Sequence, residues 1–224
     1  MKSENIQNNL RLSYDSIAKD FSATRKFAWP ELSVFIPHLP DSFKLLDLGC
    51  GNGRLLSVLK DSHKKFEYLG LDFSQELIKQ AQQNWPDYDF QVHDMQMLNF
   101  PEQSFDCVAM VASFHHLYTK KERQELLQKI YAILKPGGLL FMTNWNLGQK
   151  KYLSSWFNKF WQKKVWNDCF VTYTIPNTKQ KYWRYYHHFT KSELTGLLKS
   201  SGFSLGDNGV YWSKYNLVAL AKKP

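Results

Sequence analysis

The sequence predicts an α/β fold in which a doubly wound, mostly parallel sheet carries helices on both faces. Short apolar runs suited to buried strands alternate along the chain with stretches of helical periodicity. The first run, 43–48, ends at the glycine-rich turn Gly49-Cys50-Gly51-Asn52-Gly53, and helical sequence follows it. Strand, glycine turn and helix in this order are typical of a nucleotide-type cofactor site at the carboxyl edge of a parallel sheet.

The N-terminal segment, 1–40, is expected to form helices ahead of the sheet. Residues 3–20 have the periodicity of an amphipathic helix, whose apolar face would hold Leu10, Tyr14, Ile17 and Ala18. Pro30 suits the first turn of a second, short helix that runs through Val34 and Phe35.

The remaining elements follow in an order that defines the sheet. Parallel strands are predicted at 43–48, 66–72, 88–94, 105–112 and 139–143. Helices are predicted at 53–60, from Ser74 onward, at 119–134 and at 190–199, with Ser74, Thr119 and Thr190 as N-caps. Pro136-Gly137-Gly138 is expected to end the third of these helices. Strands at 203–211 and 215–221 would close the chain as a hairpin.

The glycine turn excludes two common kinds of nucleotide site. It contains no Gly-Lys-Ser or Gly-Lys-Thr, so it is not a phosphate-cradling P-loop. Its spacing is Gly-x-Gly-x-Gly, whereas dinucleotide enzymes use Gly-x-Gly-x-x-Gly, which disfavours a nicotinamide-dependent dehydrogenase. Cys50, inside the turn, is interpreted as a packing residue because nothing places a base beside it.

Acidic residues end the next two predicted strands. Asp72 follows Gly49 by 23 residues (72 − 49), and an acid about 20 residues beyond such a turn hydrogen-bonds ribose hydroxyls in nucleotide-binding α/β folds. Asp94 ends the third strand, ahead of Met95, where a carboxylate can accept a hydrogen bond from an adenine amino group. Glycine turn, Asp72 and Asp94 together predict a cofactor that contains a nucleoside.

Length and composition predict the domain organisation of the protein and its cellular compartment. The 224 residues fit one domain with an elaboration, and no segment approaches the roughly 18–20 apolar residues of a membrane span. Three scattered cysteines (Cys50, Cys107 and Cys169) lack metal-ligand spacing, and the N-terminus has no apolar signal region. These features predict a reduced, cytoplasmic protein with no metal and no membrane partner.

Much of the net charge of +9 falls in one segment, about 148–183. Between Gly148 and Arg184 there are eight lysine or arginine residues and one acid, Asp168. Aromatic residues are interleaved with them: Tyr152, Trp156, Phe157, Phe160, Trp161, Trp166, Phe170, Tyr173, Tyr182 and Trp183. Such a mixture suits base stacking with phosphate contact. The alternative is a helical cap whose aromatic residues are core and whose lysines are solvated, and the composition favours this simpler interpretation. Either way, we expect an insertion in a single domain of 1–224.

The ordered motifs resemble those of class I S-adenosylmethionine-dependent methyltransferases. The resemblance rests on Leu46-Asp47-Leu48-Gly49-Cys50-Gly51-Asn52-Gly53, Asp72, Asp94 and Leu134-Lys135-Pro136-Gly137-Gly138, and covers roughly 43–145. It implies a Rossmann-like, seven-stranded sheet whose last strand is antiparallel, and S-adenosylmethionine as cofactor. Asp47 and the glycine turn would hold the methionine part, Asp72 the ribose, and Asp94 with Met95 the adenine. The expected cofactor-binding set is Asp47, Gly49, Gly51, Asn52, Gly53, Asp72, Phe73, Asp94, Met95 and Ala112.

A narrower resemblance lies outside the cofactor motifs. Its pieces are Tyr14-Asp15-Ser16-Ile17-Ala18 with Phe21-Ser22-Ala23-Thr24-Arg25 and Trp29-Pro30, then Ala112-Ser113-Phe114-His115-His116-Leu117, Trp145, and Arg184-Tyr185-Tyr186-His187-His188-Phe189 with Glu193-Leu194. Together they are similar to the tRNA wobble-uridine carboxymethyl methyltransferases, which esterify the carboxylate of 5-carboxymethyluridine. The implied partner is tRNA. Eukaryotic members also use a small activating partner protein, and the need for one is left open here.

A carboxylate acceptor fits simple chemistry. It is already ionised near neutral pH, so methyl transfer to it needs no general base, only desolvation and alignment. Cationic or hydrogen-bonding groups should hold it, and the candidates are Arg25, His115, His116, Arg184, His187 and His188. The predicted catalytic residues are Arg25, His116 and Arg184. Arg25 has an alternative role in tying the N-terminal helix to the sheet, and one of His115 and His116 in structural hydrogen bonding.

Other functions stay open at this stage. The same cofactor core would serve a methyltransferase of a small carboxylate or amine, because fold and cofactor do not fix the substrate. A non-catalytic, cofactor-binding RNA-recognition module is a third hypothesis, and the intact Asp72, Asp94 and glycine turn argue against it.

Overall fold

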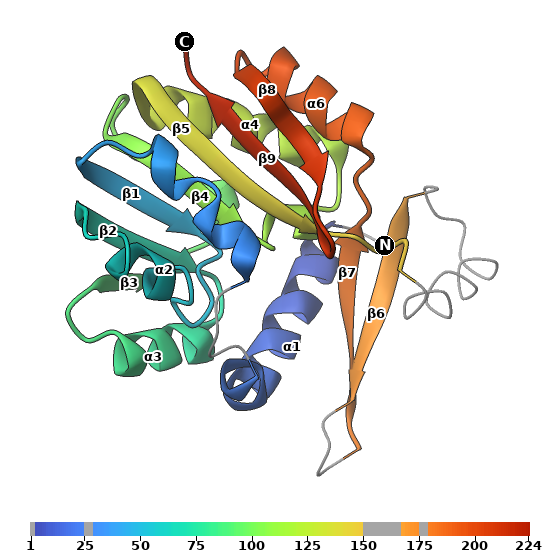
Figure 1. The fold of residues 1–224 in the computed structure, drawn as a ribbon. Helices are drawn as coiled ribbons and strands as arrows, with labels where there is room; N and C mark the ends of the chain where they lie inside the picture. The colour runs from blue at the N-terminus through green and yellow to red at the C-terminus, as the bar shows by residue number, and fades with distance from the viewer. Residues whose placement is uncertain (1–2, 25–28, 150–166, 175–178) are drawn as a thin grey trace.

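The computed structural model describes residues 3–24, 29–149, 167–174 and 179–224. Arg25 and the parts of the basic aromatic segment at 150–166 and 175–178 lie outside the described residues. Within the described residues the chain forms a seven-stranded sheet with helices packed on its faces (Figure 1). The predicted α/β fold is therefore confirmed.

The sheet reverses its strand order next to the first strand. The order is β3-β2-β1-β4-β5-β9-β8, and β9 runs antiparallel to both of its neighbours. Its strands are β1 (Ser42–Leu48), β2 (Lys65–Asp72), β3 (Asp89–Val92), β4 (Phe105–Val111), β5 (Leu134–Trp145), β8 (Ser204–Trp212) and β9 (Asn216–Lys222). The switch point lies between β1 and β4, and doubly wound sheets bind ligands outside the carboxyl ends of the strands there.

Five α-helices lie in the described residues, and four of them, all but α2, begin where the sequence predicts. They are α1 (Ser3–Ala23), α2 (Leu56–Lys60), α3 (Gln75–Asn84), α4 (Lys120–Ile133) and α6 (Lys191–Ser200). The hydroxyls of Ser74, Thr119 and Thr190 accept the backbone N–H groups that the N-cap role requires, at 3.1–3.2 Å. None of the described helices has both the length and the apolar character needed to cross a bilayer.

Two helix boundaries differ from the prediction. The expected second helix is a pair of 3₁₀ turns, η1 (Pro30–Ser33) and η2 (Ile36–His38). Pro37 lacks the N–H that a continuous α-helix would bond to the carbonyl four residues earlier. Helix α2 begins at Leu56 and not at Gly53, whose φ of +76° is incompatible with a right-handed helix.

Two apolar clusters, one on each face of the sheet, form most of the core. Neighbouring residues of β1, Leu45 and Leu46, belong to different clusters because successive side chains of a strand point to opposite faces. One cluster includes Leu127 of α4 and Leu198 of α6, and the other includes Leu59 of α2. Burial on both faces explains why β4 is almost continuously apolar.

The described part of the basic aromatic segment forms a second, two-stranded sheet. Strands β6 (Asp168–Thr174) and β7 (Lys181–His187) pair antiparallel and lie beside α1 (Figure 1). The helical cap that the sequence offered as an alternative is therefore wrong for these residues. The pairing also continues past the expected limit at 183, because β7 ends at His187.

Candidate functional site

The glycine turn after β1 adopts a backbone that only glycine tolerates easily. Gly49, Gly51 and Gly53 have φ values of +74°, +57° and +76°. A Cβ on Gly49 would lie 2.3 Å from the Cβ of Ser113, so the turn and the segment after β4 approach too closely for any side chain. The Gly51 position instead opens toward Phe21, 3.8 Å away.

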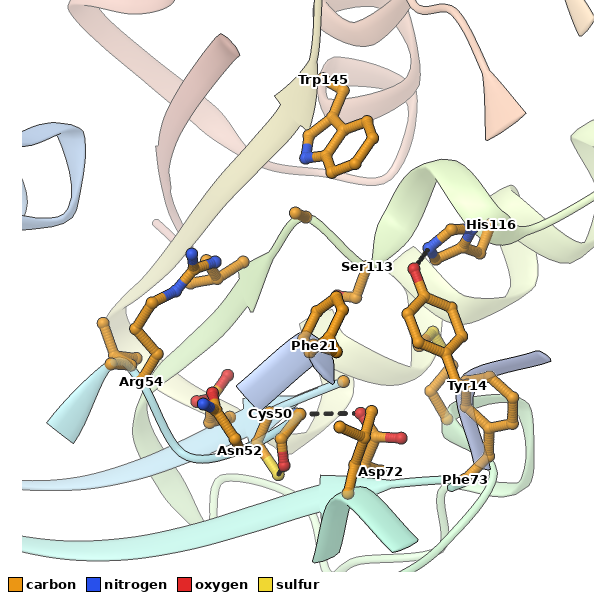
Figure 2. A pocket seen from close by; sticks show the side chains of 18 of the residues that line it. Tyr14, Phe21, Cys50, Asn52, Arg54, Asp72, Phe73, Ser113, His116 and Trp145 are labelled. Carbon is orange, nitrogen blue, oxygen red and sulfur yellow. Dashed lines mark hydrogen bonds between the residues drawn. The ribbon is translucent and has the colours of Figure 1, made fainter. Parts of the chain in front are cut away.

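A cavity lies at the carboxyl ends of β1, β2 and β4, beside the switch point (Figure 2). Eight of the ten predicted cofactor-binding residues line it: Asp47, Gly49, Gly51, Asn52, Asp72, Phe73, Met95 and Ala112. Gly53 does not line it, because its place is beside Trp85 and Phe90, which a Cβ would meet at 2.7 and 2.9 Å. Gly53 thus serves the packing of the turn.

A second cavity adjoins the first between α1 and the segment after β3. Asp94 lines this second cavity and not the first, while Phe73, Met95 and His116 line both. One carboxylate oxygen of Asp94 accepts the N–H of Gln96 at 2.9 Å and so begins the short turn η3 (Met95–Met97). The nine predicted residues at the two cavities therefore form one continuous wall.

Asp72 is held by the backbone on both of its oxygens. Oδ2 accepts the N–H of Gly51 at 2.9 Å, and Oδ1 accepts the N–H of Ser74 at 2.9 Å. Burial raises the pKa of Asp72 to about 6, although these N–H donors oppose the rise. The side chain is therefore ionised at neutral pH and fixed in orientation.

Asp47 has one oxygen without a protein partner. Oδ2 accepts the hydroxyl of Tyr68 at 2.8 Å, whereas Oδ1 has no hydrogen-bond partner among the described residues. The residue is 1% exposed, and burial, together with the nearby charge of Asp72, raises its pKa to about 7. A buried, unpartnered acceptor at a cavity wall favours a ligand that brings a donor or a positive charge.

His116 lies at both cavities and is held as a neutral ring. Its Nδ1 donates to the carbonyl of Tyr185 at 2.8 Å, which leaves Nε2 to accept the hydroxyl of Tyr14 at 2.9 Å (Figure 2). Burial lowers the pKa of His116 to about 3, against the opposing backbone bond and with help from the nearby charge of Arg184. The ring therefore acts through hydrogen bonding and not through charge.

Arg184 lies behind the cavity wall and not on it. It is 4% exposed, and its guanidinium lies 5.4 Å from the ring centroid of Tyr14 and 6.0 Å from that of Trp145, both of which line the first cavity. The rings of Tyr173 and Tyr186 lie at 5.5 and 5.6 Å. A permanent cation in an aromatic surround thus borders the site.

The other predicted histidines have different surroundings. His115 packs beside Trp145 and Tyr186, and its Nε2 has no hydrogen-bond partner among the described residues. His187 lies between the carboxylates of Asp168 and Glu193, at 2.7 and 2.8 Å, while His188 stacks on Trp212. Burial lowers the pKa of His187, but the two carboxylates outweigh it and raise the pKa. Within the described residues, no cluster of histidine, cysteine and acidic side chains suits a metal ion.

Sequence reasoning missed the part of the site that α1 contributes. Tyr14 and Phe21 line the first cavity, and Ser22 accepts the side-chain amide of Asn52 at 3.1 Å. The sequence placed Tyr14 on the apolar face of a helix, and its buried position agrees with that. Only the fold reveals that its hydroxyl meets His116.

A profile of the methyltransferase domain matches residues 45–138. The tRNA (carboxymethyluridine(34)-5-O)-methyltransferase of Schizosaccharomyces pombe is 29% identical over 224 residues, which cover 94% of each chain. The protein of the same name from Arabidopsis thaliana is 32% identical over 145 residues, which cover 64% of this chain. The match spans 34% of the length of the Arabidopsis relative and 21% of the length of a mouse relative.

Solved structures share the fold at lower identity. An S-adenosylmethionine-dependent methyltransferase from Methanosarcina mazei superposes with a TM-score of 0.73 at 24% identity, covering 88% of this chain and 98% of that one. The Burkholderia thailandensis 1,6-didemethyltoxoflavin-N1-methyltransferase, with bound S-adenosylhomocysteine, superposes with a TM-score of 0.68 at 19% identity. The match covers 100% of this chain and 91% of that one. A Haloferax volcanii methyltransferase in complex with the activator Trm112 superposes with a TM-score of 0.66 at 18% identity. The match covers 96% of this chain and 97% of that one.

Proposed function

Since this chain carries a class I S-adenosylmethionine-dependent methyltransferase domain, we propose that it methylates the carboxylate of a 5-carboxymethyluridine-type wobble nucleoside in tRNA. The observation that carries the proposal is the match to the Schizosaccharomyces pombe tRNA (carboxymethyluridine(34)-5-O)-methyltransferase, which covers 94% of both chains. Because a match over 94% of the chain includes the segments that supply His116 and Arg184, it extends beyond the cofactor core.

The two cavities have the donors and acceptors that the cofactor requires. We assign the unpartnered Oδ1 of Asp47 to the ammonium of its methionine part, and Asp72 to its ribose hydroxyls. Asp94, Met95 and Phe73 would enclose its adenine at the second cavity. When bound, S-adenosylmethionine supplies a methyl group activated by an adjacent sulfonium.

The acceptor side is suited to holding an anion. Arg184 is a buried cation next to two residues of the cavity wall, Tyr14 and Trp145, and we assign it to attracting the acceptor carboxylate. A carboxylate needs no proton removed, and the neutral, fully hydrogen-bonded His116 is consistent with positioning of Tyr14 and not with general-base catalysis. Arg25 stays in the proposal as a second cation, although it lies outside the described residues.

A small activating protein is part of the proposal. The neighbouring Haloferax volcanii methyltransferase forms a complex with the activator Trm112. We expect the present chain to gain stability or activity from a protein of that kind, so the assays below should be run with and without one.

The test is transfer of a labelled methyl group to defined acceptors. We expect label in tRNA that carries 5-carboxymethyluridine, none in the same tRNA with unmodified uridine, and loss of the label in mild alkali, which cleaves a methyl ester. Asp72→Asn is the control that should lose cofactor binding. Transfer to a small carboxylate or amine but not to tRNA would move the function to a small-molecule methyltransferase. No transfer to any acceptor by a cofactor-bound protein would favour a binding module.

A further inference from the structure

The two faces of the β6–β7 pair differ in what they contact. Successive residues of a strand point to opposite faces, so Tyr182, Arg184 and Tyr186 share one face of β7, and Lys181 and Trp183 lie on the other. Trp183 pairs across the ribbon with Thr172, and Lys181 pairs with Thr174. The ribbon therefore has an inner and an outer face.

The inner face belongs to the site already described. Tyr182 packs against the apolar cluster that contains Tyr14 of α1, and Tyr186 stacks on Trp145 at 4.9 Å between ring centroids. Arg184 lies within 6 Å of the rings of Tyr14 and Trp145. This face is packed against the body of the protein.

The outer face is open toward the tip of the ribbon. Trp183 is 52% exposed, and Lys181 on the same face is exposed, while Phe170 and Thr172 are half-buried. Lys179, which precedes β7, is also exposed. A single exposed aromatic residue is ordinary on a protein surface. Here it is a tryptophan next to lysines, on a ribbon that extends away from the main sheet beside α1 (Figure 1).

The charge of the ribbon favours a polyanion. Its strands hold Lys181 and Arg184, with Lys179 just before β7, and its acid, Asp168, is buried and bonded to His187 and Tyr185. No negative side chain on these strands therefore offsets the exposed lysines. An aromatic face beside lysines binds single-stranded nucleic acid by base stacking and phosphate contact.

From this arrangement we propose that the outer face of β6–β7, formed by Lys181 and Trp183, binds the single-stranded anticodon loop of the tRNA. The inference rests on the proposed function and adds the surface that holds the substrate. Strands lie about 4.8 Å apart, so a loop passes around the edge of this ribbon in a short distance. A loop held on Trp183 can thus extend a neighbouring nucleotide toward the cavity wall formed by Tyr14 and Trp145, which Arg184 borders.

The test is a titration of the full-length protein with a labelled anticodon stem-loop carrying 5-carboxymethyluridine, repeated at several salt concentrations. Trp183→Ala should weaken binding between about 5-fold and 100-fold, whereas Trp183→Phe, which keeps a stacking ring, should retain most of the affinity. Lys181→Glu should weaken binding and lower the slope of log affinity against log salt by about 1. Lys199→Glu, an equal charge change on α6, should leave the slope near the wild-type value.

The outcomes separate this inference from the proposed function. Calorimetric affinity for S-adenosylmethionine should be unchanged in all four variants, which shows that they are folded. If wild type methylates tRNA but Trp183→Ala and Lys181→Glu bind the stem-loop as Lys199→Glu does, the inference is overturned and the function stands. If these variants instead lose only the response to a small activating protein, the face binds protein and the inference is again overturned. If the wild-type protein binds no tRNA, both the inference and the proposed function are overturned.

Discussion

The cofactor side and the acceptor side of this site are built in different ways. The cofactor side consists of backbone and carboxylates at the ends of three strands that follow one another in the sequence, β1, β2 and β3, with Gly49, Asp72 and Asp94 in that order. The acceptor side gathers Tyr14, His116 and Arg184 from distant parts of the chain. The hydrogen bond between Tyr14 and His116 spans 102 residues, and the one between His116 and Tyr185, the neighbour of Arg184, spans 69. A local motif forms the first side, and the whole fold forms the second.

This difference separates the two kinds of evidence for function. Turn geometry and a carboxylate can be shared by many methyltransferases, because they contact only the common cofactor. The aromatic surround of Arg184 requires α1, β5 and β7 to meet, so it reports on the acceptor. Variants should therefore damage one side and spare the other.

The largest effect should come from one methyl group on the cofactor side. Gly49→Ala places a Cβ 2.3 Å from the Cβ of Ser113 at a φ of +74°, so the turn must shift. We expect calorimetry to detect no binding of S-adenosylmethionine and the melting temperature to fall by several degrees.

Gly196→Ala is the matched control for that change. Nothing lies within 4 Å of a Cβ at Gly196 in helix α6, so the same substitution should stabilise the protein by about 0.5–1 kcal/mol. Wild-type cofactor affinity in Gly49→Ala would mean that the close approach to Ser113 does not shape the site.

Asp47 should make the stability of the cofactor-free protein depend on pH. Its folded-state pKa is raised to about 7 from 3.8, so its contribution to stability is complete below pH 3.8 and is lost as pH rises through 7. Asp47→Asn removes this loss. From pH 5 to pH 8 the unfolding free energy of the variant, relative to that of wild type, should rise by about 2–3 kcal/mol in denaturant unfolding. A constant difference across that range would contradict an ionisable, buried Asp47.

Arg184 tests the acceptor side alone. Arg184→Ala should lower kcat/KM for methyl transfer about 100-fold or more, because the buried charge next to the acceptor is lost, while affinity for S-adenosylmethionine stays within a few-fold of wild type. Arg184→Lys should recover part of the rate, since it keeps charge but not the planar fork. An equal loss of cofactor affinity and rate would show that the two sides are not separable.

The smallest effect should be the coupling between Tyr14 and His116. Tyr14→Phe leaves the buried Nε2 of His116 without its donor, at a cost of about 1–3 kcal/mol in unfolding free energy. A double-mutant cycle with His116→Leu should recover about 1 kcal/mol, because the second change removes the stranded acceptor. Strict additivity would contradict a hydrogen bond between the two side chains.

The sequence predicted most of the fold because each strand ends at a residue with a local signal. The glycine turn, Asp72 and the N-caps Ser74, Thr119 and Thr190 all depend on residues a few positions away. The division of the helix expected from Pro30 into two 3₁₀ turns could have been predicted from Pro37, but this signal was not used. Gly53 was placed with the cofactor by its motif, but its backbone faces Trp85 and Phe90.

The acceptor side was less accessible to sequence reasoning. Apart from its place in the narrower resemblance, Tyr14 had only the apolar periodicity of α1, which indicates burial and says nothing of a partner 102 residues away. The basic aromatic composition did not distinguish a helical cap from the strands β6 and β7, since aromatic residues suit both. Register, which puts Arg184 inward and Trp183 outward, is a property of the folded sheet.

The central claim, methylation of a wobble carboxylate in tRNA, is tested most directly by mass spectrometry of tRNA nucleosides from cells that lack this protein. We predict that 5-carboxymethyluridine accumulates with its carboxylate free, and that the methyl ester returns when the wild-type protein is restored but not when Arg184→Ala is supplied. Unchanged levels of the ester in cells without the protein would contradict it.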